Sequence, residues 1–171
     1  MRIVFLDFDG VLNSRALVER SLTPHTPGLG LLAEDAVARV ERLCASGEAG
    51  IVVSSTWRLT FELPSLERML RAKGLATAPV LDVTPMIPHK RGRGQEIQQW
   101  LDTAPRARGW SIDGMVILDD QPDMLHLLPW LVQSSFETGL TDDHLDAANA
   151  VLTRAAPPLS SRRPRPARRS P

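Results

Sequence analysis

The sequence predicts an α/β fold, in which a central parallel sheet of about five strands carries helices on both faces. Two observations lead to this class. Short apolar runs recur along the chain, and a segment with the apolar spacing of a helix lies between successive runs. The 171 residues contain no internal repeat, so we expect one three-layer, Rossmann-like domain over residues 1–154.

The expected strands are short and almost continuously apolar, which is typical of strands buried on both faces of a parallel sheet. They cover residues 3–6, 51–53, 79–83, 115–118 and 131–132. The first run is too uniformly apolar to have one solvated face, so we expect it to lie inside the sheet.

The expected helices fall between these runs and are bounded by residues that favour helix ends. Residues 34–46 carry a buried face and stop at Gly47, whereas residues 63–73 have Pro64 in the first turn and Gly74 just beyond the end. The remaining helices are predicted at 95–101, 122–128 and 141–153.

The composition excludes several classes of protein. An apolar fraction of 43% is enough for a core, but no apolar stretch approaches the ~20 residues of a membrane span. No secretory leader is recognisable, and we expect a cytoplasmic protein without membrane contact. The single cysteine, Cys44, permits no internal disulfide and is expected to be a small buried hydrophobe.

The end of the chain differs in composition from the rest. Residues 155–171 are rich in proline and contain five arginines, with little apolar surface to bury. We expect a flexible basic tail, which serves either as an arm for nucleic acid or as solubilising disorder.

Polar clusters follow three of the five expected strands. Asp7 and Asp9 come after the first strand, Ser54 after the second, and Asp119 with Asp120 after the fourth. Because ligands of open α/β folds gather at the carboxyl ends of the strands, these clusters are predicted to share one edge and form one site.

The residue types suit phosphoryl transfer. Asp7 and Asp9 project the same way from an extended strand, so both side chains can meet one phosphate. One carboxylate can attack and the other can move a proton. Crowded carboxylates repel each other unless a hard cation such as Mg²⁺, which prefers oxygen ligands, lies among them.

Four segments resemble, in order, the motifs of the haloacid dehalogenase-like (HAD) hydrolases. They read FLDFDGVLN, VVSSTW, RGRGQEIQQWL and VILDDQPDM, and the resemblance covers residues 1 to about 153. The combination is most similar to the HAD phosphatase domain of Swiss army knife RNA repair proteins. The second Asp of the first motif points to a phosphatase, because dehalogenating members lack an acid there.

The resemblance implies a catalytic set. Asp7 is expected to form an aspartyl-phosphate, Asp9 to act as general acid and base, and Ser54 to hydrogen-bond a phosphoryl oxygen. Ser55 and Thr56 are alternatives to Ser54, or turn formers. The third-motif cation is expected at Arg93, with Lys90 and Arg91 as alternatives.

The resemblance also implies a Mg²⁺ site. Asp7 and Asp119 are expected to supply carboxylates and Asp9 its backbone carbonyl, with Asp120 or Asp123 completing the set.

The expected substrate is a phosphorylated group with a bulky remainder, such as the end of a polynucleotide, or a nucleotide. About two dozen residues separate Gly10 from the helix at 34–46, enough for a flap but not for a cap domain. Ser55, Trp57, Arg58 and Lys90 are candidate substrate contacts, although a Trp at this place also serves for packing.

The sequence leaves three other functions open. A capless protein phosphatase is less favoured, because Val11 stands where such enzymes often carry Thr. A non-catalytic binding module, or a small-molecule phosphatase, would keep the same fold.

Overall fold

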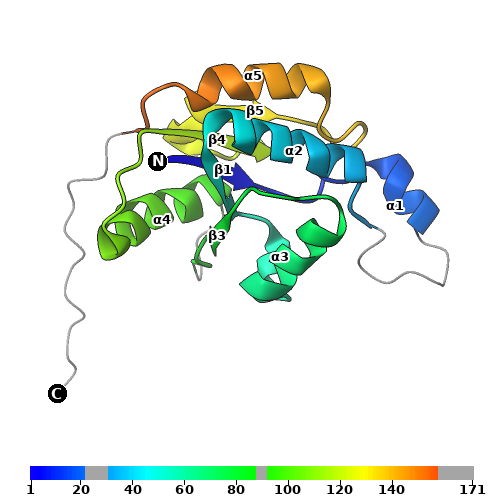
Figure 1. Ribbon diagram of the computed structural model, residues 1–171, viewed down its shortest axis with the longest axis horizontal. Coiled ribbons are helices and arrows are strands. Elements are labelled where there is room, and N and C mark those ends of the chain that lie inside the picture. The colour runs from blue at the N-terminus through cyan, green and yellow to red at the C-terminus, as the bar shows by residue number, and fades with distance from the viewer. Residues whose placement is uncertain (22–30, 88–91, 158–171) are drawn as a thin grey trace.

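A five-stranded parallel sheet forms the centre of the protein, as predicted. The computed structural model describes residues 1–21, 31–87 and 92–157. The strand order is β3-β2-β1-β4-β5, which places the N-terminal strand in the middle (Figure 1). The strands are β1 (Arg2–Leu6), β2 (Ala49–Val53), β3 (Val80–Val83), β4 (Gly114–Asp119) and β5 (Leu131–Gln133).

Helices cover both faces of the sheet. Figure 1 shows α2 and α5 on one side and α4 on the other. The α-helices are α1 (Arg15–Ser21), α2 (Glu34–Gly47), α3 (Leu63–Ala72), α4 (Arg93–Arg108) and α5 (Asp142–Leu152), and the 3-10 helices are η2 (Thr56–Leu59) and η3 (Leu125–Trp130). The predicted three-layer α/β architecture is therefore confirmed. Within the described residues no segment forms a cap domain.

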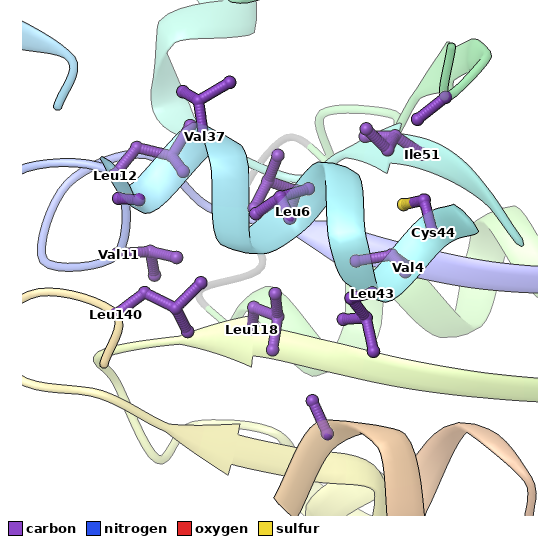
Figure 2. Packing of buried hydrophobic residues seen from close by; sticks show 14 of the residues in the cluster. Val4, Leu6, Val11, Leu12, Val37, Leu43, Cys44, Ile51, Leu118 and Leu140 are labelled. Carbon is purple, nitrogen blue, oxygen red and sulfur yellow. The ribbon is translucent and has the colours of Figure 1, made fainter. Parts of the chain in front are cut away.

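Alternation along β1 divides the core into two clusters. Val4 and Leu6 pack with residues of α2, α3 and α5, whereas Ile3 and Phe5 pack with residues of α4 and η3. All four side chains are fully buried, and each contributes about 1.5–3 kcal/mol by leaving water. Figure 2 shows α2 crossing the strands, with the predicted buried Cys44 among the labelled core residues.

The predicted helix at 122–128 is wrong. Residues 121–124 have no regular secondary structure, and a 3-10 helix begins only at Leu125. A tertiary contact explains this difference, because the carboxylate and the carbonyl of Asp123 accept hydrogen bonds from the start of α4. Its carboxylate accepts from the backbone N–H of Arg93 at 3.0 Å, and its carbonyl from that of Gly94 at 3.2 Å.

Two other differences concern α1 and α4. The helix α1 lies in the segment where only a flap was expected. The helix α4 runs through Pro105, well past the predicted end at 101, and stops at Gly109 with φ +67°.

The predicted tail begins with residues that pack on the domain. Ala155 pairs with Gly114 in an antiparallel bridge, and its carbonyl accepts from the indole N–H of Trp130 at 3.1 Å. Residues 158–171, which include all the tail arginines, lie outside the described residues, so the basic arm stays a prediction. None of the helices in the described parts of the chain is long and apolar enough to cross a membrane.

Candidate active site

The register of β1 and β4 brings Asp7 and Asp119 together. Leu6 pairs with Leu118, and the backbone N–H of Asp7 donates to the carbonyl of Leu118 at 3.0 Å. Both aspartates continue the strand alternation that places Phe5 on the α4 side of the sheet. The two carboxylates therefore meet on the side from which α4 begins.

Asp120 joins these two residues to form an acidic cluster. Carboxylate oxygens of Asp7, Asp119 and Asp120 all lie within 4.8 Å of one another. Asp120 can lie close to the other two carboxylates because residue 10 is a glycine. Gly10 has φ +72°, and a Cβ at this position would lie 2.6 Å from the Asp120 side chain. Asp123, the alternative to Asp120, instead contacts the start of α4.

The acidic cluster suits a hard divalent cation. Oδ2 of Asp119 is buried and has no hydrogen-bond partner, whereas Oδ1 accepts from the backbone of Gln121 at 2.9 Å. Three carboxylates that supply only oxygen donors match the preference of Mg²⁺. A buried acceptor without a hydrogen bond is costly inside a protein, so the residues present fit such an ion.

Burial dominates the electrostatics of the two central carboxyls. It raises the pKa of Asp119 to about 7, against the opposing effect of the Arg93 guanidinium, and the neighbouring Asp7 charge adds to the rise. Burial also raises the pKa of Asp7, although Arg93 and hydrogen bonds from Phe8 N–H and Ser55 act the other way. A nearby cation would therefore favour the charged forms that the site requires.

Arg93 is the predicted third-motif cation that the structure places in the site. Its Nη1 lies 3.2 Å from Oδ1 of Asp7, and its Nε lies 3.6 Å from Oδ2 of Asp119. The start of α4 is fixed by the Asp123 contacts and by Gly94, where a Cβ would come within 2.5 Å of the Met124 carbonyl. Lys90 and Arg91 lie outside the described residues.

The two serines after β2, Ser54 and Ser55, also lie beside Arg93 and Asp7. Ser54 is fully buried and its Oγ has no partner, while its carbonyl accepts from Arg93. Ser55 is also buried; its hydroxyl interacts with the Asp7 carboxyl and caps η2 by accepting from the backbone N–H of Trp57 at 3.4 Å. Ser54 therefore keeps a hydroxyl available for a ligand.

Asp9 is held by two donors that the sequence did not reveal. The indole Nε1 of Trp57 donates to Oδ2 at 3.0 Å, and the amide Nδ2 of Asn13 donates to Oδ1 at 2.8 Å. Asn13 is itself buried and accepts from the backbone N–H of Gly10 at 2.8 Å. The carboxyl of Asp9 thus has a defined orientation outside the acidic cluster.

Arg58, predicted to contact substrate, points into the protein. Its guanidinium donates to the carbonyls of Thr84, Ser54 and Ser55 at 2.9, 2.7 and 2.6 Å, and to Glu96 at 2.5 Å. The side chain is only 4% exposed. These contacts correct the expectation, because the group joins the loop after β2 to α4 and offers no open face to a phosphate.

Buried polar residues mark one edge of the sheet. In the described part of the chain they are Asp7, Asn13, Ser54, Ser55, Thr84, Asp119 and Ser134, and each ends a strand or lies in the loop that follows one. Ser134 was not predicted, although it follows β5 directly; its hydroxyl donates to the Gly10 carbonyl at 2.6 Å. The signal that would have found it is a hydroxyl residue directly after a strand, as Ser54 follows β2 and Thr84 follows β3.

Sheet order and acidic cluster together define a HAD-like α/β protein without a cap in its described residues. The chain matches the family described as HAD domain in Swiss Army Knife RNA repair proteins over residues 3–145. It therefore belongs to this family, within a group whose members are typically phosphohydrolases. No curated protein and no solved structure gives a significant match to the chain.

Proposed function

We propose that this protein is a Mg²⁺-dependent phosphatase that removes a terminal phosphate from nucleic acid or nucleotides through an aspartyl-phosphate on Asp7. The observation that carries the proposal is the meeting of Asp7, Asp119 and Asp120 with Arg93 at the carboxyl edge of the sheet. Anionic oxygens beside a guanidinium match what phosphoryl transfer requires.

The proposed reaction has two steps. An oxygen of the Asp7 carboxylate attacks phosphorus while the bond to the leaving oxygen breaks, and Asp9 gives that oxygen a proton. Water then attacks the phosphorus of the aspartyl-phosphate, Asp9 takes a proton from the water, and the Asp7 carboxylate is released with inorganic phosphate. The fixed orientation of Asp9 on Trp57 and Asn13 supports its part in both steps.

Arg93 and Ser54 are proposed to bind the phosphoryl oxygens. Arg93 already lies between Asp7 and Asp119, and 13% of its side chain stays exposed. Ser54 offers a buried hydroxyl with no other partner. Both contacts would strengthen as negative charge moves onto the transferred group.

Asp7, Asp119 and Asp120 would hold Mg²⁺, with the Asp9 carbonyl as a further proposed ligand. When bound, the ion supplies positive charge that offsets the phosphoryl oxygens and the crowded carboxylates.

A polynucleotide end is the proposed substrate for two reasons. The family description names RNA repair proteins, and no cap covers the edge of the sheet in the described residues. An uncovered edge admits a phosphate attached to a large group.

The test is a comparison of phosphate release from 3′- and 5′-phosphorylated oligonucleotides, nucleotides and phosphopeptides in Mg²⁺, with Asp7→Asn as the control. We expect oligonucleotides or nucleotides to give the highest kcat/KM and the variant to give none. Release from no substrate, or equal release by the variant, would overturn the proposal. A clear preference for phosphopeptides would replace the substrate class.

A further inference from the structure

An open surface groove of about 380 Å³ lies beside Asp9. Its walls are formed by Asp9, Thr56, Trp57, Leu59, Thr60 and Phe61, and we name it the Leu59 groove. All of these except Asp9 come from η2 and the two residues after it.

The Leu59 groove is lined largely by apolar surface, and none of the described residues in its walls is positively charged. Leu59 is 57% exposed, and among the leucines of the described residues only Leu125 and Leu128 are exposed to a similar degree. The rings of Trp57 and Phe61 lie next to each other with centroids 6.1 Å apart. Because the indole N–H of Trp57 is already bound to Asp9, the two rings offer mainly apolar surface.

The groove is poorly suited to a second phosphate. Among the described residues, Asp9 is the only charged one that lines it, and it is acidic, so it would repel an anion. Thr56 and Thr60 add exposed neutral hydroxyls at the rim. An uncharged planar group with polar edges matches this lining, since it can stack on apolar surface and hydrogen-bond at its rim.

The position of Asp9 indicates which part of a substrate would lie in the Leu59 groove. A general acid must be within hydrogen-bond reach of the leaving oxygen. The group attached to that oxygen therefore extends past Asp9, and the Leu59 groove is the space that Asp9 borders.

We infer that the Leu59 groove is the leaving-group subsite and binds the base of the nucleotide that carries the scissile phosphate. This inference rests on the proposed phosphatase function and narrows its substrate to base-bearing ends. Stacking on Leu59 and the neighbouring rings is sequence-tolerant, because every base has an apolar face.

The experiment uses pairs of oligonucleotides that differ only in the terminal phosphorylated nucleotide, which is either intact or abasic. Pairs with the phosphate at the 3′ end and at the 5′ end are both assayed in Mg²⁺. We expect the wild-type protein to favour the intact member of the hydrolysed pair by about tenfold in kcat/KM.

Leu59→Ala is expected to reduce this ratio toward one. Leu128→Ala is the matched control, since Leu128 is also half exposed but lies on η3 outside the groove, and we expect it to keep the wild-type ratio. Phe61→Leu provides a second variant that shortens the aromatic wall.

The outcomes separate the two proposals. Equal hydrolysis of intact and abasic ends, or an unchanged ratio in both Leu59→Ala and Phe61→Leu, overturns the subsite and leaves the phosphatase function standing. Failure to hydrolyse any phosphate ester overturns the phosphatase function, and the subsite with it. A ratio that falls in the groove variants and not in Leu128→Ala supports the subsite.

Discussion

The indole Nε1 of Trp57 donates a 3.0 Å hydrogen bond to Oδ2 of Asp9, across 48 residues of sequence. The Trp57 ring is held in turn by an edge-on contact with Phe8, with ring centroids 5.3 Å apart. The loop after β2 therefore controls the orientation of a carboxyl that follows β1. Trp57, a predicted substrate contact, therefore also orients the Asp9 carboxyl, and this positioning role can be tested directly.

Trp57→Phe should impair protonation of the leaving group, because it removes the donor and keeps a ring. We expect kcat to fall by about tenfold for a poor leaving group, part of the roughly 10²–10⁴-fold that general acid catalysis contributes. p-Nitrophenyl phosphate should be affected much less. Trp130→Phe is the control, because it removes a similar indole bond, to Ala155, away from the site. Equal losses on both kinds of substrate would refute a positioning role.

Asp7→Asn should abolish turnover by about 10⁴-fold or more, because the amide is not a nucleophile. Without Mg²⁺ the variant should also unfold at a higher temperature, since burial already disfavours the charged Asp7 carboxyl. Asp146→Asn, at an exposed position on α5, should change neither property. Phosphate release by a folded Asp7→Asn protein would exclude the proposed nucleophile.

The stability of the metal-free protein should fall as pH rises from about 4 to about 7. Burial raises the pKa of Asp119 from 3.8 to about 7, so in this range the folded chain keeps a proton that the unfolded chain has lost. The free energy of unfolding then decreases with pH. Thermal melts of the wild-type protein in EDTA at pH 5 and pH 8 measure this loss of stability. The loss should be smaller for the wild-type protein in Mg²⁺ without EDTA, and for Asp119→Asn in EDTA. An identical slope in all three samples would contradict the assignment.

Gly10→Ala should weaken Mg²⁺ binding. The substitution adds a Cβ 2.6 Å from the Asp120 side chain at a residue with φ +72°. Gly109→Ala is the matched control, because Gly109 has φ +67° and nothing within 4 Å. Both should lose about 1–2 kcal/mol through the backbone. The Mg²⁺ concentration that gives half-maximal thermal stabilisation should rise above the wild-type value in Gly10→Ala and not in Gly109→Ala. The same Mg²⁺ concentration for both variants would exclude Asp120 from the metal site.

Glu96→Gln should destabilise the protein by about 3 kcal/mol, because it leaves the buried Arg58 charge without its carboxylate. The pair of Arg71 and Glu67 is more exposed, at 33% and 39%, and offers the control, since Glu67→Gln should cost less than about 1 kcal/mol. Urea denaturation gives both values. Arg58 also binds the Ser54 carbonyl at 2.7 Å, so kcat should fall in Glu96→Gln as well. Similar stability of the two variants would mean that the Arg58 pair is not buried in solution.

The architecture was predictable because its signals are local. Apolar runs and helical spacing depend on residues a few positions apart, and they located all five strands and the helices α2 to α5. Parallel strands end at one edge, so the position of Asp7, Ser54 and Asp119 after their strands was enough to bring them together. The short helix predicted at 122–128 is instead the 3-10 helix η3, which begins only at Leu125, because Asp123 contacts α4 some distance away in the sequence.

The sequence alone thus determined the α/β class, the family and the edge of the sheet on which the acidic residues lie. Only the tertiary structure decided which neighbours those residues have: Asp120 beside Asp7 and Asp119, Trp57 on Asp9, and Arg58 turned inward to Glu96. The physical reason is that periodicity reports which face of an element is buried. The partner of a polar side chain depends on how separate elements pack, and on which buried group would otherwise lack a hydrogen bond.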